Sequence, residues 1–254
     1  MRDTKDQLMR IGDTDFLRIP DTAISDRDLA EWQNNLLLND CILCNPEASR
    51  IIFATPHFFC MAGAGPVATG YSMITPHVHI STIAELDEEL FEEFQFAHNF
   101  HLQVLELSYG AGYTAYEHGR LGSCRWAEMA NSTGHHCFHA HRVFVAGSFN
   151  LTNTVRRPFQ TIRELRTEVD LRQVCEPYIF LEEVSSNKEV LRHAFLHADG
   201  IPSQFLRRCI ADSQGASSRW DWRRHPDWQS VRETVLRLRS MAKSIQLQHS
   251  TEAL

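Results

Sequence analysis

The sequence lacks any uninterrupted apolar run near the roughly 18 residues that a membrane-spanning helix requires. Its first residues, MRDTKDQLMRIGDTD, carry charges where a secretory signal would need an apolar segment. It also lacks internal repeats and low-complexity segments, which argues against solenoid and fibrous architectures. These absences predict a soluble, cytoplasmic protein that contacts no membrane.

Cysteine is scarce, with seven residues in a chain of 254. An odd number does not suit a disulfide framework, and a chain with 43% hydrophobic residues can bury a full core without one. Cys41 and Cys44 stand in DCILCNPE, at a spacing typical of metal or redox chemistry. We therefore expect reduced thiols.

Positive charge is also in short supply, because the formal net charge is −7. This argues against broad nucleic-acid binding, and no nucleic-acid partner is expected. Residues 202–254 are the exception, with a balance of +4. Their arginines either face an anion or only solvate the outer faces of helices.

The order of predicted elements indicates the fold class. RIIFATPHFFCMAG and TGYSMITPHVHI read as neighbouring strands, and residues 83–107 repeat apolar side chains with a period of about 3.6 and predict one long helix. Strand character returns in TAYEHG, CFHAHRVFVAG and PYIFLEEV. This order predicts an α+β fold with a largely antiparallel sheet.

Three regions follow from the same pattern. Residues 1–38 are polar and predict an N-terminal arm, and residues 39–185 form the α+β domain. Beyond Ser185 the pattern becomes helical, with one helix opening at Pro202 or Ser203 and another at about Asp227. Residues 186–254 are therefore predicted to be a helical C-terminal extension.

Histidines gather in GHHCFHAHRVFV, residues 134–145. On a strand His139 and His141 project to one face, and Ala140 and Arg142 to the other. Such an HxH pair occurs in zinc sites and in phosphoryl-transfer sites. By itself it is a weak signal.

A second HxH, His77-Val78-His79, and the two cysteines strengthen this signal. Two thiolates and two imidazoles complete a tetrahedral zinc site without a water ligand. The alternatives are that the cysteines are buried core thiols and that His79 caps a helix.

CILC, GYSMITPHVHI, a long helix and FHAHRVFV, in this order, resemble the histidine triad (HIT) superfamily. The resemblance is to a bacterial branch with a CxxC zinc knuckle, an EHG…HAH motif (here Tyr116-Glu117-His118-Gly119) and a PSQxLRR/WDWR C-terminal extension. Galactose-1-phosphate uridylyltransferases are more distantly similar. The resemblance implies a HIT-like antiparallel sheet and a homodimer.

The resemblance also implies roles for individual residues. The ligands of a structural zinc would be Cys41, Cys44, His79 and His139, and His141 would be the nucleophile that forms a phospho-imidazole on a nucleotide-like phosphate. The third histidine of the family falls at Val143, which cannot donate a hydrogen bond. A donor would then come from elsewhere, from His136, Ser132 or Arg142, or phosphoryl transfer is weakened.

The extension carries a further set of substrate-binding candidates. Where a helix opens, free amides and arginine side chains favour an anion. These candidates are Ser203, Gln204, Arg207 and Arg208, and the alternative is that they dock the extension onto the acidic body.

Three functions remain open at this point. The first is a HIT-type nucleotide hydrolase or nucleotidyltransferase that acts through a covalent phospho-histidine, with His141 and His136 as catalytic residues. The second is a catalytically weakened HIT-fold nucleotide-binding or scaffold protein. The third is an enzyme whose histidine-rich site holds a reassigned metal and performs non-phosphoryl chemistry. A homodimer is expected in addition because the predicted helix carries Phe91, Phe94, Phe96 and Phe100.

Overall fold

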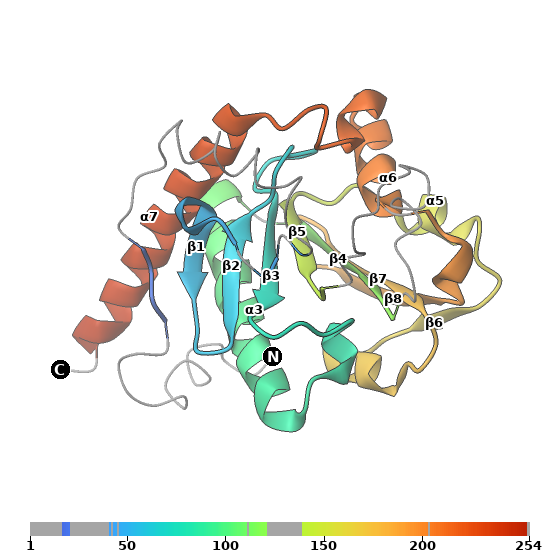
Figure 1. Cartoon of the computed structure of the whole chain (residues 1–254), viewed down its shortest axis with the longest axis horizontal. Coiled ribbons are helices and arrows are strands. Elements are labelled where there is room, and N and C mark those ends of the chain that lie inside the picture. Colours follow the sequence, from blue (N-terminus) through green and yellow to red (C-terminus); the bar gives the residue numbers. More distant parts are fainter. Residues whose placement is uncertain are drawn as a thin grey trace.

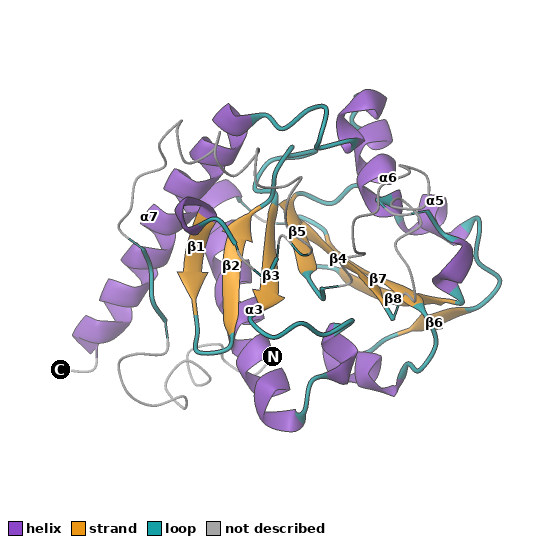
Figure 2. Cartoon of the chain, in the orientation of Figure 1, coloured by secondary structure: helices purple, strands orange, loops and turns teal. Residues whose placement is uncertain are grey.

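A single antiparallel sheet organises the chain in a computed structural model, which describes residues 17–20, 41, 43–44, 46–110, 112–120, 139–202 and 204–252. The strand order is β1-β2-β3-β5-β4-β7-β8-β6, and each neighbouring pair is antiparallel (Figures 1 and 2). The strands are β1 (Ile51–Ala54), β2 (Phe58–Ala62), β3 (Ser72–Pro76), β4 (Tyr113–Gly119), β5 (Arg142–Ala146), β6 (Ile162–Glu164), β7 (Tyr178–Val184) and β8 (Val190–Leu196). The α+β class with an antiparallel sheet and one long helix is confirmed.

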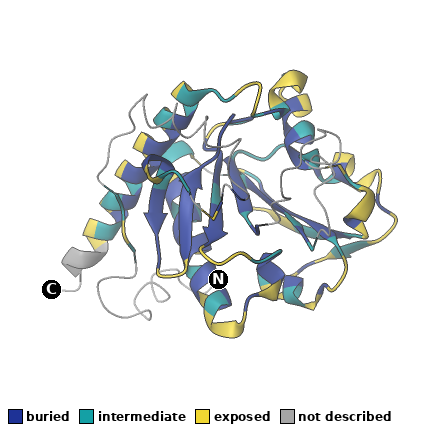
Figure 3. Cartoon of the chain, viewed as in Figure 1, coloured by how far each residue is buried: buried dark blue, intermediate teal, exposed yellow. Residues whose placement is uncertain are grey.

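Helices cover both faces of the sheet. The long helix α3 (Glu88–Tyr109) begins where Asp87 accepts a hydrogen bond from the Leu90 amide at 2.9 Å, and α7 (Trp228–Glu252) packs alongside it. The short helices α5 (Thr152–Arg156) and α6 (Phe205–Ser213) pack against the opposite face. Most of the sheet is buried between these layers (Figure 3). Among the described helices, none combines the length and apolar character needed to cross a bilayer.

The prediction that the chain turns helical after Ser185 is wrong for residues 190–196. These residues form β8, which pairs with β7 from Val184 opposite Val190 to Tyr178 opposite Leu196. The free edge of β7 supplies backbone hydrogen-bond partners that outweigh the helix propensity of a segment rich in leucine, arginine and alanine. The two later helices are confirmed as α6 and α7, whereas most of the expected arm at residues 1–38 lies outside the described residues.

The aromatic face of α3 is covered within the chain. Phe91, Phe94 and Phe100 are buried, and they belong to the same core cluster as Leu238 and Ile245 of α7. The edge of β4 is likewise occupied, because β7 pairs with it over seven residues. The homodimer stays a prediction, but these aromatic side chains no longer support it.

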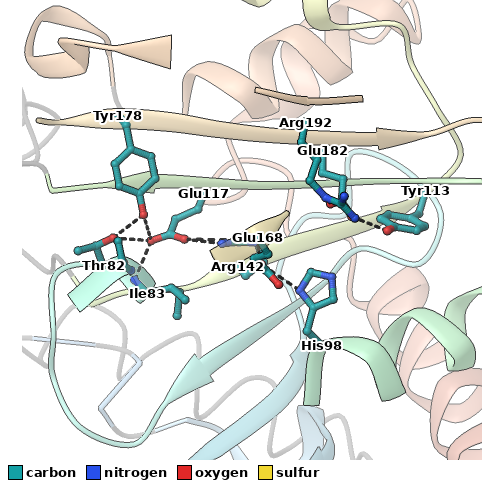
Figure 4. A network of polar contacts seen from close by, with 11 residues as sticks. Thr82, Ile83, His98, Tyr113, Glu117, Arg142, Glu168, Tyr178, Glu182 and Arg192 are labelled. Carbon is teal, nitrogen blue, oxygen red and sulfur yellow. Dashed lines mark hydrogen bonds and ion pairs between the residues drawn. The ribbon is translucent and has the colours of Figure 1, made fainter. Parts of the chain in front are cut away.

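A buried ion-pair network holds β5 against β4 (Figure 4). Arg142 is fully buried and donates to the Glu117 carboxylate at 3.0 Å, and it also contacts the Glu168 carboxylate. His98 lies 3.2 Å from Glu168. Burial alone would raise the pKa of Glu168, but His98 and Arg142 outweigh it and lower that pKa to about 2. The Glu168 carboxylate is therefore ionised at neutral pH.

The position of Arg142 corrects the sequence-based role given to this residue. Its guanidinium stacks over the Phe180 ring, 4.0 Å from the centroid, and faces two carboxylates in the interior. Burial lowers the pKa of Arg142, but Glu168 and Glu117 more than offset this and the net shift is upward. Arg142 is thus a structural cation and not a substrate-binding donor.

Replacing Arg142 with Met is expected to lower the free energy of unfolding by about 3–5 kcal/mol, because Glu117 and Glu168 would be left as buried, uncompensated charges. Urea unfolding measures this loss. As a matched control, Glu106→Gln breaks an ion pair with Lys188 whose partners are 48% and 61% exposed, and it should cost about 1 kcal/mol or less. Equal losses in the two variants would contradict the assigned role.

Candidate metal centre and active site

Four side chains from distant parts of the sequence converge ahead of β5. The ligand atoms of Cys41, Cys44, His79 and His139 all lie within 4.8 Å of one another. Cys44 Sγ is 3.1 Å from His79 Nδ1 and 3.4 Å from His139 Nδ1, and Cys41 Sγ is 3.5 Å from His139 Nδ1. A tetrahedral zinc ion with bonds of about 2.3 Å to sulfur and 2.0–2.1 Å to nitrogen has sulfur-to-nitrogen edges of about 3.5 Å. The donor atoms therefore fit a tetrahedral metal ion.

The orientation of His139 is fixed from behind. Its Nε2 donates to the Pro76 carbonyl at 2.7 Å, which leaves the Nδ1 lone pair directed at the cysteines. The Ala140 amide donates to the Ile80 carbonyl, also at 2.7 Å, and ties this segment to the chain just after β3. Such outer hydrogen bonds hold the ring and tautomer that a metal ligand needs.

The two cysteines need a cation to ionise together. Partial desolvation and the neighbouring Cys41 raise the pKa of the Cys44 thiol to about 11. A bound divalent ion reverses this preference, because thiolates are its ligands. The chemistry of the donor set is thus that of a metal site, and the four residues are the ones that the sequence grouped.

His141 lies two residues beyond the candidate ligand His139 and is half-buried. Its Nδ1 donates to the His139 carbonyl at 3.0 Å, which leaves the Nε2 lone pair free. Burial lowers the pKa of His141, and the His139 hydrogen bond and the Glu117 charge only partly oppose this. The imidazole is therefore neutral at neutral pH, as a nucleophile must be.

Strand β5 begins at Arg142, later than the sequence predicted, yet the alternation of side chains extends back to His139. Ala140 packs in the core cluster beneath α3, whereas Val143 packs in the cluster beneath α6. His139 and His141 therefore share the face of the sheet turned away from α3.

Val143, which stands at the position of the family's third histidine, lies inside the core. Val143 is 2% exposed and packs in one cluster with Tyr116 and with Leu206 and Ile210 of α6. A side chain here contacts the extension and not solvent. Two of the donors suggested in its place, His136 and Ser132, lie outside the described residues.

The residues of the extension divide into two groups. Arg207 is buried and donates to the Trp220 carbonyl at 2.9 Å and the Gly65 carbonyl at 2.6 Å, so it docks the extension onto the body. Arg208 stacks over the Trp220 ring, 3.9 Å from the centroid. Gln204 precedes α6 with a φ of 65°, and Ser203 lies outside the described residues. An anion-binding role for Gln204, Arg208 and Ser203 stays a prediction.

Sequence reasoning missed one neighbour of His141. The β4 and β5 register that pairs Tyr116 with Val143, continued by two positions, places His118 of β4 beside His141, and a charge on His141 acts on His118. His118 belongs to the EHG motif, but the sequence predicted no role for it. Only the pairing of the two strands brings the two residues together.

No protein-family model matches the chain, and no curated protein matches it. Several solved structures are similar to it, including the following two. A hypothetical histidine triad nucleotide-binding protein from Sulfolobus tokodaii strain 7 is 20% identical, with a TM-score of 0.33, over 42% of this chain and 68% of that one. A Hit-like protein involved in cell-cycle regulation from Bartonella henselae, solved with an unknown ligand, is 16% identical, with a TM-score of 0.31, over 50% of this chain and 79% of that one. Because these sequence identities and TM-scores are low, the chemistry of the site is argued only from the geometry of its own residues.

The purified chain is expected to contain about one tightly bound transition-metal ion, and Cys44→Ser should remove most of it. Metal binding is coupled to folding, so the loss of one ligand weakens both. The free energy of unfolding of the variant should therefore fall by several kcal/mol, on the order of the metal-binding free energy that is lost. Elemental analysis by mass spectrometry and thermal unfolding measure both effects.

Cys175→Ser is the matched control, since Cys175 is an exposed free cysteine. It should change neither metal content nor melting temperature. Metal-free parent protein with the same melting temperature as the metal-loaded protein would contradict the site.

Proposed function

We propose that this chain is a HIT-type nucleotide hydrolase or nucleotidyltransferase that acts through a covalent phospho-histidine at His141. Its substrate is a nucleotide-like phosphate. One observation carries the proposal: the Nδ1 of His141 is held at 3.0 Å by the carbonyl of His139, a residue of the four-ligand cluster. A nucleophile needs this kind of support, with its tautomer set and its attacking nitrogen free.

Zinc is the metal that this donor set fits, with Cys41, Cys44, His79 and His139 as its ligands. Four protein ligands would leave no open position on such an ion, so it would stabilise the fold at this point and would take no part in the reaction. The protein's contribution is a rigid backbone at His139, from which the position of His141 follows.

In the first half-reaction the Nε2 of His141 attacks the phosphorus atom. A nitrogen-to-phosphorus bond forms, and the bond from phosphorus to the leaving oxygen, or to the leaving nitrogen of a phosphoramidate, breaks. The leaving group departs with the electron pair, and a leaving amine takes up a proton from solvent. The ring then gains positive charge, and the hydrogen bond to the His139 carbonyl stabilises it. In the second half-reaction water or another acceptor takes the phosphoryl group, and His141 recovers its electron pair.

A second candidate function follows from Val143. Val143 stands where the HIT superfamily has its third histidine, and this valine is buried beneath α6. A HIT-fold nucleotide-binding protein with little or no turnover would tolerate that loss. It would bind nucleotide phosphate without forming a covalent adduct.

The reassigned-metal alternative has no support in the described part of the chain. There, the four-residue cluster is the only group of three or more side chains placed to hold a metal ion. A metal count of one per chain would agree with this, and a count of two would favour the alternative.

His141→Asn is expected to abolish both covalent adduct and product, a loss of at least about 10³-fold in turnover, while metal content is unchanged. The probes are adenosine 5′-phosphoramidate and diadenosine tetraphosphate, with intact-protein mass reporting the nucleotidyl adduct. Turnover equal to that of the parent would contradict the covalent mechanism.

The matched control is His197→Asn. His197 is exposed and adopts a left-handed backbone conformation with φ of 62°, which asparagine tolerates well. Its adduct and product yields should equal those of the parent. Nucleotide binding by the parent without any adduct would support the non-catalytic candidate.

A further inference from the structure

The register between β4 and β5 places two histidines opposite each other. Tyr113 pairs with Ala146, and the pairing continues to Tyr116 and Val143. One position further, Glu117 and Arg142 are joined by their 3.0 Å ion pair (Figure 4). The next position in this register brings His118 opposite His141.

The two histidines also share one face of the sheet. Tyr116 and Val143 pack together in the cluster beneath α6, whereas Glu117 and Arg142 point to the other face. By alternation, His118 and His141 return to the face of Tyr116 and Val143. The paired residues of β4 and β5 end at Tyr116 and Val143, and directly opposed residues have Cβ atoms about 4.5–5.5 Å apart. The same register, continued to His118 and His141, predicts that the two imidazoles are neighbours, and a charge on His141 does act on His118.

One nitrogen of His118 is buried without a partner. The ring hydrogen-bonds to the backbone of Ala198, and because this bond raises the pKa of His118 the ring is the donor. Its Nε2 is buried and has no hydrogen-bond partner among the described residues. A buried polar atom left without a partner is costly, and such atoms in native proteins call for a functional explanation.

The unpartnered nitrogen is a proton acceptor. Burial lowers the pKa of His118 to about 4, the Ala198 hydrogen bond opposes this, and the charge of a protonated His141 adds to the lowering. His118 is therefore neutral at neutral pH, and a neutral imidazole carries one lone pair that can accept a proton.

We propose that His118 is the general base of the second half-reaction, in which water attacks the phospho-imidazole of His141. This inference rests on the proposed function. The water oxygen forms a bond to phosphorus, one proton of the water passes to Nε2 of His118, and the bond between phosphorus and His141 breaks. The electron pair of that bond returns to His141, and His118 later releases its proton to solvent.

The proposal explains how hydrolysis proceeds although Val143 is buried. The neighbouring strand supplies a second imidazole from β4, on the same face and opposite the nucleophile. The covalent intermediate then has a base beside it without any side chain from position 143.

The test compares His118→Asn with the parent, using adenosine 5′-phosphoramidate and intact-protein mass measured over time. Adduct formation should proceed within about threefold of the parent rate, and adduct breakdown should slow by about 10²–10⁴-fold, the usual contribution of a general base. The adduct should therefore accumulate in the variant.

His193→Asn is the matched control. His193 is half-buried, has a lowered pKa and an unpartnered Nδ1 among the described residues, but it lies opposite Leu181 in the register. Its breakdown rate should match that of the parent. A loss equal to that of His118→Asn would show a general effect of removing a half-buried histidine, and it would overturn the proposal.

A pH profile of the parent needs no variant and therefore does not depend on how His118→Asn folds. Because a base must be unprotonated, adduct breakdown should stay level from pH 8 to about pH 5.5 and fall only toward pH 4. A base with the ordinary histidine pKa of about 6.5 would lose half its rate near that pH. A midpoint near 6.5 would overturn the assignment.

The remaining outcomes separate this inference from the proposed function. If His118→Asn breaks down its adduct as fast as the parent, the inference fails and the covalent mechanism stands. If the parent forms neither adduct nor product, or His141→Asn retains turnover, both fail. Two metal ions per chain in the parent and one in His118→Asn would make His118 a metal ligand and overturn its role as a base.

Discussion

The buried ion pair between Arg142 and Glu117 fixes the register of β5 against β4, and the rest of the site depends on that register. A slip of β5 by one residue would send Arg142 to the opposite face, beneath α6, where apolar side chains offer it no partner, and would leave Glu117 without its cation. It would also reverse the direction of His141. The ion pair therefore determines the direction of the His141 side chain, although Arg142 and Glu117 point to the other face of the sheet.

Rigidity at His141, the proposed nucleophile, comes from the residues on both sides of it in the sequence. Ahead of it, His139 is held by the Pro76 carbonyl and by the thiol and imidazole ligands around it, and after it Arg142 is locked in the interior. A side chain between two fixed neighbours loses little further entropy when it reacts. The C-terminal extension adds a third constraint, since α6 packs over Val143, two residues beyond His141.

The sequence predicted features that depend on short segments. It did not predict features that depend on how two strands pair. The long helix follows from the spacing of its apolar residues, and the resemblance to the HIT superfamily implied the four metal-ligand candidates, whose donor atoms converge. Residues 190–196 have side chains that suit a helix, and only the open edge of β7 makes them a strand. Alternation placed Arg142 on the face away from His141, but its carboxylate partners are 25 and 26 residues away. His118 was missed for the same reason, because its place beside His141 depends on the register between β4 and β5.

The central claim is that His141, and no other histidine on this face, carries the phosphoryl group. The most direct measurement is tandem mass spectrometry of the quenched adduct, under alkaline conditions that preserve the nitrogen-to-phosphorus bond, to assign the modified residue. The account predicts a nucleotidyl group on His141 in the peptide that contains His139 and His141, with His139 unmodified. A group located on His139 or His118, or on a residue outside this face, would contradict it.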